Sequence, residues 1–145
     1  MGGVTVTEAL RVVAGVGCGL VAGLLFAFSA GVMTALRNLP AGRGAAAMRS
    51  VNAAVLNPLF LGVFGGAGVA AVATAVASGG APAVVGAAVL YVVGVLGVTA
   101  AVSVPLNDAL AAERVPWELY LVRWTRWNHV RAGAATAALG LLLVA

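Results

Sequence analysis

The chain has few of the charged residues that a water-soluble domain needs on its surface. Only 8% of its 145 residues are charged, whereas a typical soluble domain has about 25%. The hydrophobic residues make up 63% of the chain and the mean hydropathy is +1.10. The eight basic residues are all arginine, and there are only four acids. The composition therefore predicts an integral membrane protein whose main partner is the lipid bilayer.

Histidine, cysteine and carboxylates are too scarce for most self-contained catalytic sites. One histidine, one cysteine and four acids cannot build a zinc, di-iron or multi-copper centre within one chain. Cys18 has no partner for an intrachain disulfide, and in an apolar run it is expected to be a small buried residue. A haem needs only one axial histidine, so His129 permits a haem without giving evidence for one. A cofactor-free site is equally allowed.

Uncharged runs predict four membrane-spanning helices, because a bilayer core of about 30 Å requires about 20 helical residues. The first is the run that ends before Arg37. The long run between Arg49 and Asp108 fits two, divided at the glycine- and proline-containing turn 78–82. The fourth has to begin near Arg126, because too few residues follow the last arginine. The predicted spans are 12–36, 52–77, 83–104 and 126–145.

Short connections between these spans predict a single all-α domain over 1–145, an antiparallel up-down-up-down four-transmembrane-helix bundle. The loops 37–49 and 108–126 carry three arginines each, whereas the opposite side has only Arg11. Positively charged loops stay in the cytoplasm, so both termini are predicted to lie outside. The richness in Ala, Gly, Val and Arg without Lys suggests a bacterial gene, and hence the cytoplasmic membrane. The arginines are too few and too scattered to bind nucleic acid.

Polar residues of all four spans meet at one end of such a bundle. Polar and ionisable groups inside a membrane are costly, and they usually face the bundle interior or a wet cavity. This end is therefore the predicted functional site. Its candidate residues are Arg49, Asn52, Asn57, Asn107, Trp124, Trp127, Asn128, His129 and Arg131.

Each of these residues also has a simpler interpretation. Trp and Arg at a membrane end commonly anchor a helix in the interface, and the asparagines could hydrogen-bond between helices. Arg131 lies inside the predicted span and needs a partner such as Asp108 or a bound anion. His129 points about 100° away from Asn128, and its role as a ligand, an acid or base, or a helix-to-helix hydrogen bond stays open.

Three motifs resemble the anthrone oxygenase-like family of small membrane proteins. They are MRSVNAAVLNP at 48–58, VPLNDAL at 104–110 and W-x2-Y-x3-W-x2-WNHVR at 117–131. Each motif is weak alone, but together and in this order they are fairly specific, and the resemblance covers nearly the whole chain. The family pattern falls on Met48, Asn52, Asn57, Pro58, Pro105, Asn107, Trp127, Asn128 and Arg131.

The resemblance implies an oxygenase. Family members with a known role take part in oxidising anthrones to anthraquinones with dioxygen, in aromatic polyketide biosynthesis. The chain is accordingly expected to act on an activated aromatic or other small hydrophobic substrate at the cytoplasmic end of the bundle, with His129 or a neighbour removing a proton, or with His129 binding a haem. The expected catalytic residues are Asn52, Asn107, Asn128, His129 and Arg131. The expected substrate-binding residues are Met48, Arg49, Asn57, Trp124 and Trp127.

The alternative is a non-catalytic four-span scaffold or a small transporter. A proton-coupled exporter needs a carboxylate buried in the middle of a helix, and the first three predicted spans contain none. That argues against an exporter more than against a scaffold. Small residues recur every four positions at 15–23 and at 62–70, a spacing that favours close packing within the bundle and also permits a homo-oligomer.

Overall fold

The computed structural model describes residues 4–145, and every regular element in that range is helical. The first long helix is continuous from Val6 to Arg37. It consists of α1 (Val6–Ala27), the wider π-helical turn η1 (Phe28–Val32) and α2 (Met33–Arg37). A capping box starts it, in which the side chains of Thr5 and Glu8 each accept a hydrogen bond from the other's backbone N–H.

The segment expected as the second span is interrupted. Its first residues belong to α3 (Arg43–Ala54), and the rest forms α4 (Pro58–Ala77). Asn57 is extended and accepts a hydrogen bond from the backbone N–H of Phe60 at 2.9 Å, as an N-cap does. Proline at the first helical position has no N–H to lose there, and it disfavours helix in the residue before it. The Asn57-Pro58 pair therefore ends one helix and starts the next.

The third and fourth long helices are each longer than expected. The third is continuous from Pro82 to Ala111 and contains α5 (Pro82–Val89), η2 (Leu90–Gly97), η3 (Thr99–Ser103) and α6 (Val104–Ala111). The fourth is α7 (Trp117–Val144), which begins at Trp117 and not near Arg126. Within the described residues, three helices are long and apolar enough to cross a membrane: Val6–Arg37, Pro58–Ala77 and Pro82–Ala111.

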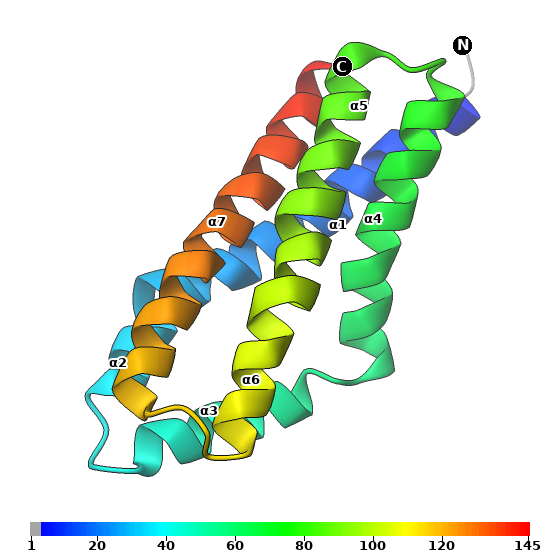
Figure 1. Cartoon of the computed structure of the whole chain (residues 1–145). Helices are drawn as coiled ribbons and strands as arrows, with labels where there is room; N and C mark the ends of the chain where they lie inside the picture. Colours follow the sequence, from blue (N-terminus) through cyan, green and yellow to red (C-terminus); the bar gives the residue numbers. More distant parts are fainter. Residues whose placement is uncertain (1–3) are drawn as a thin grey trace.

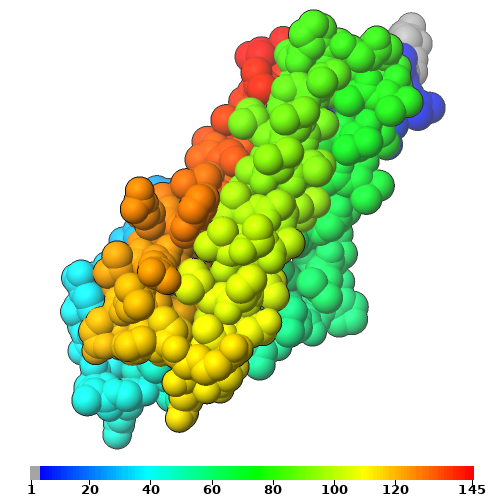
Figure 2. Space-filling model, in the orientation of Figure 1, coloured from blue at the N-terminus to red at the C-terminus, as the bar shows by residue number. Residues whose placement is uncertain are grey.

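The long helices pack side by side into an elongated molecule (Figures 1 and 2). α1 packs along both α4 and α7, and α5 packs against the same two helices. The turn between α4 and α5 lies at one end, whereas α2, α3 and α6 gather at the other (Figure 1). Many valines and leucines on the outside are exposed, which suits a surface that faces lipid.

The interior has two apolar clusters. The larger runs along the bundle and is built mainly from Ala and Val, with Cys18 buried in it as expected. The smaller lies at the α2–α3–α6 end, where Tyr120 and Trp124 pack with Met33 and Met48. This second cluster supports the walls of the site described below.

Several close helix contacts depend on glycines, among them that of Gly44 in α3 with the Leu36 carbonyl of α2. An added Cβ at Gly17 would lie 2.7 Å from Ala67 Cβ, and one at Gly94 would lie 2.5 Å from Ala134 Cβ. Most of the periodic small residues in the sequence are not at such contacts. Gly15 and Gly19 have only the Leu139 side chain nearby, and Gly23, Gly62 and Gly66 have nothing within 4 Å.

Candidate functional site

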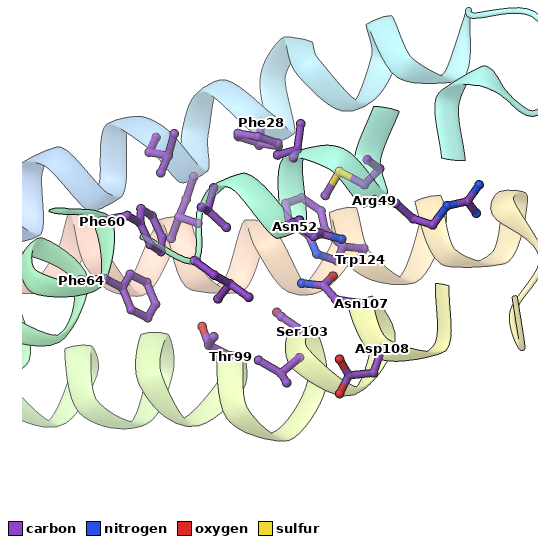
Figure 3. Close-up of a pocket in the computed structure, with 18 of the residues that line it drawn as sticks. Phe28, Arg49, Asn52, Phe60, Phe64, Thr99, Ser103, Asn107, Asp108 and Trp124 are labelled. Carbon is purple, nitrogen blue, oxygen red and sulfur yellow. The ribbon is translucent and has the colours of Figure 1, made fainter. Parts of the chain in front are cut away.

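A cavity of about 380 Å³ lies where the first helix, α3, α4, the third helix and α7 meet. Its size is within the range of small-molecule binding pockets, about 300–1,000 Å³. The lining is mainly apolar, with Phe60 and Phe64 on one side and Asn52 and Asn107 on the other (Figure 3). An apolar space with a few polar groups can hold a flat hydrophobic molecule and fix its orientation.

Arg131 places a buried guanidinium on the wall of this cavity. The side chain is 5% exposed. Its Nη2 donates to Asn128 Oδ1 at 2.7 Å and its Nη1 to Thr99 Oγ1 at 3.1 Å. Both partners are neutral, and Asp108, the partner considered from sequence, lines the same cavity without a hydrogen bond to Arg131. The guanidinium carbon lies 5.2 Å from the ring centroid of Trp124, a cation–π contact.

Two buried N–H groups beside the cavity lack an acceptor. Within residues 4–145, Arg131 Nε and Trp124 Nε1 are buried without a hydrogen-bond partner, and both residues line the cavity. Buried donors in proteins nearly always find an acceptor. Within the described residues, each of these two N–H groups therefore remains an unpaired donor in a side chain of the cavity wall.

Asn128, which does not line the cavity, holds the Arg131 guanidinium in place. Its side chain is completely buried, and its Nδ2 donates to the Leu25 carbonyl and to Ser29 Oγ, both at 2.7 Å. Ser29 belongs to η1, and Thr99, the other partner of Arg131, belongs to η3. Widened π-helical turns occur frequently at functional sites. Here the two turns supply the hydroxyl groups that hold the Asn128–Arg131 pair.

A second polar network joins α3, α6 and α7. The Tyr120 hydroxyl donates to Asn107 Oδ1 at 2.8 Å and accepts from Asn52 Nδ2 at 3.4 Å. Tyr120 is completely buried, and its ring stacks on Trp117 with a centroid distance of 5.7 Å. The two asparagines line the cavity, whereas the tyrosine supports them from outside it.

The structure brings six of the ten sequence-predicted site residues to the cavity wall, and places Asn128 directly behind it. Asn57 caps α4 and lines a neighbouring hollow with Phe60 and Phe64. Trp127 is 40% exposed, and His129 is exposed on the same helix; neither lines the cavity. The predicted residues on the wall are Met48, Arg49, Asn52, Asn107, Trp124 and Arg131.

Sequence reasoning gave no site role to Thr99 or Tyr120. Thr99, Ser103 and Asn107 are spaced four residues apart, so they share one face of the third helix, and all three line the cavity. That spacing was the available signal for Thr99. For Tyr120, no pattern in the sequence distinguishes a buried tyrosine that holds two asparagines.

The residues around this cavity do not fit a haem. An axial histidine has to face the space that holds the porphyrin, and His129 lies outside the cavity. Within residues 4–145, no group of three or more His, Cys, Asp or Glu side chains is placed to hold a metal ion. The chemistry proposed below therefore assigns no step to a haem or to His129.

We expect His129→Ala to have the same visible absorption spectrum as the wild-type protein, because the imidazole is exposed on α7 and does not line the cavity. The spectra of the two detergent-purified proteins are compared as isolated and after reduction. A haem band that is present in the wild-type protein and lost in the variant would contradict this expectation.

Comparison with known proteins identifies the family of the chain. The family model described as Anthrone oxygenase matches residues 50–141. No curated protein and no solved structure matches the chain. The matched range is more than half of the chain and includes Asn52, Asn107, Trp124 and Arg131. The chain belongs to the anthrone oxygenase family.

Proposed function

We propose that the chain is a membrane-embedded oxygenase that oxidises an activated aromatic ketone, of the anthrone type, with dioxygen in the cavity beside Arg131. Family membership supports the reaction class. The observation that supports this cavity as the site is that two residues of its wall carry unpartnered buried donors, Arg131 Nε and Trp124 Nε1. N–H donors fixed in an apolar space stabilise an oxygen that becomes negatively charged during a reaction.

An anthrone suits these donors chemically. It carries a carbonyl group opposite a methylene group, and both are flanked by two aromatic rings. Loss of a methylene proton gives an enolate whose charge rests largely on the oxygen. The guanidinium of Arg131 and the indole N–H of Trp124 would hydrogen-bond that oxygen, and the low dielectric of the cavity strengthens the interaction. Asp108 is the carboxylate on the cavity wall that would accept the proton.

The enolate then reacts with dioxygen, which dissolves readily in apolar surroundings. Overall, the methylene group and one dioxygen molecule become a carbonyl group and one water molecule. The carbon loses four electrons and the two oxygen atoms gain four, so the reaction requires no external reductant. The protein's contribution is to favour the enolate and to hold it against Phe60 and Phe64.

We further propose that α7 is the fourth span and that the cavity lies at the cytoplasmic end of the bundle. α7 packs along α1 and α5, and its 28 residues span about 42 Å at about 1.5 Å per residue. Residues 132–144 are uncharged and mainly apolar, whereas the first half carries the tryptophans and arginines suited to a membrane interface. The arginine-rich loops at the cavity end support its cytoplasmic placement.

The test is oxidation of anthrone by the detergent-purified protein under ¹⁸O₂. The expected result is anthraquinone that carries one ¹⁸O atom, formed with one dioxygen consumed per anthrone, faster than with heat-denatured protein. The denatured control is required because anthrones also oxidise slowly in air. A rate equal to that control would reject the oxygenase and favour a non-catalytic membrane scaffold.

A further inference from the structure

We propose that Asn52 and Asn107 form a pair that recognises a hydroxyl group on the substrate, and that Tyr120 is the positioning residue that sets their orientation. The hydroxyl is separate from the oxygen that binds Arg131. The inference rests on the proposed function for the ring system of the substrate. The roles of the three side chains follow from their hydrogen bonds.

The Tyr120 hydroxyl forces the two amides to differ. It has one proton, which it donates to Asn107 Oδ1 at 2.8 Å, and it accepts from Asn52 Nδ2 at 3.4 Å. One amide therefore contacts the tyrosine through its oxygen and the other through its nitrogen. If both amides were flipped together, the tyrosine would reverse its roles and the pair would remain unlike. If only one were flipped, either the tyrosine proton would lose its acceptor or one amide oxygen would face the tyrosine without a donor.

The amide atoms that do not bond to Tyr120 suit the hydrogen bonding of a hydroxyl group. Asn107 Nδ2 and Asn52 Oδ1 have no hydrogen-bond partner within residues 4–145, and both residues line the cavity close to each other (Figure 3). The pair thus presents one donor and one acceptor to a ligand. A hydroxyl group both accepts and donates a hydrogen bond, whereas a methoxy or a carbonyl group only accepts. A ligand without the hydroxyl proton would leave the acceptor on the asparagine unpaired.

Packing keeps this arrangement rigid. Tyr120 is completely buried, stacks on Trp117, and belongs to the apolar cluster that also contains Met48 and Trp124. Its hydroxyl therefore cannot turn to a different pair of partners without moving the cluster. Rigid polar groups of this kind discriminate strongly against a ligand that lacks the matching atom.

The experiment compares hydroxyanthraquinones with their methyl ethers. Dissociation constants for 1- and 2-hydroxyanthraquinone and for both ethers are measured by quenching of tryptophan fluorescence in detergent. With the wild-type protein, at least one hydroxy isomer is expected to bind about tenfold more tightly than its ether. In Tyr120→Phe this ratio is expected to fall close to one, because the amides can then rotate.

Tyr91→Phe is the matched control. Tyr91 is also completely buried, and its hydroxyl donates one hydrogen bond, to the Phe64 carbonyl at 2.8 Å. The hydroxyl-to-ether ratio is expected to stay at the wild-type value in this variant. A general loss of packing would change the hydroxyl-to-ether ratio in both variants, whereas a loss of amide orientation would change it only in Tyr120→Phe.

Two outcomes would overturn the inference. Equal affinity for every hydroxyanthraquinone and its ether in the wild-type protein would show that no hydroxyl is recognised. A preference that survives in Tyr120→Phe would show that the size of the methyl group, and not the amide pair, causes it. Either outcome leaves the oxidation of unsubstituted anthrone intact, whereas failure of the proposed function would appear as the absence of that oxidation.

Discussion

Arg131→Gln is expected to lower the rate of anthrone oxidation by about 10²–10³-fold, the usual effect of removing a donor that stabilises a developing oxyanion. The substitution removes the positive charge and the unpartnered Nε from the cavity wall. The measurement is the initial rate of oxygen uptake over a range of anthrone concentrations. The loss should appear mainly in kcat, because the interaction is strongest when the enolate forms.

Arg126→Gln is the matched control for this prediction. Arg126 lies on the same helix but is exposed and does not line the cavity. Its variant should oxidise anthrone at close to the wild-type rate. Arg131→Lys should fall between the two, because lysine keeps the charge but lacks the planar fork of N–H groups. If Arg131→Gln oxidised anthrone as fast as Arg126→Gln, the guanidinium would have no part in the reaction.

Asn128→Leu is expected to lower both stability and activity. The free energy of unfolding should fall by about 1–3 kcal/mol, because the substitution removes the bonds that Asn128 makes to the Leu25 carbonyl and Ser29 Oγ and leaves Arg131 Nη2 without its acceptor. Activity should fall as well, since Arg131 then keeps only its hydrogen bond to Thr99 and its contact with the Trp124 ring. Stability is measured by titrating the detergent-solubilised protein with a denaturing detergent, and activity by oxygen uptake.

Thr125→Val provides the control for Asn128→Leu. Thr125 lies on the same helix, and its Oγ1 is buried without a hydrogen-bond partner within residues 4–145. Replacing that hydroxyl with a methyl group removes an unpaired polar atom, so the variant should be as stable as the wild type or more so. Equal stability of Asn128→Leu and the wild type would show that Asn128 does not hold the helices together.

The sequence predicts the apolar helices well and their ends less well. Uncharged runs can be read directly from the sequence, and the part of the chain that the structure describes confirms three helices of membrane-spanning length. The helix ends depend on local backbone chemistry, which the length of a run does not show. The structure shows that α3 ends before Asn57-Pro58 and that α4 begins at Pro58. α7 begins at Trp117 because polar residues also continue a helix when neighbouring helices support it.

Helical spacing predicts which site residues of one helix lie on the same face. Trp124, Asn128 and Arg131 share one face of α7, because residues three and four positions apart lie on the same side of a helix. The same spacing predicts that His129 points away from Asn128, and the structure places the His129 side chain on the exposed surface. Contacts between different helices could not be predicted from the sequence. The widened turns η1 and η3 determine which side chains meet, and no sequence pattern indicates such turns.

The most direct test of the central claim is a structure of the protein determined with bound anthraquinone. We expect the three rings in the cavity between Phe60 and Trp124, with one carbonyl oxygen within hydrogen-bond distance of Arg131 Nε. Such a position would give the two unpartnered N–H groups their acceptor. Anthraquinone bound anywhere else, with the cavity beside Arg131 empty, would contradict the assignment of the oxygenase reaction to this site.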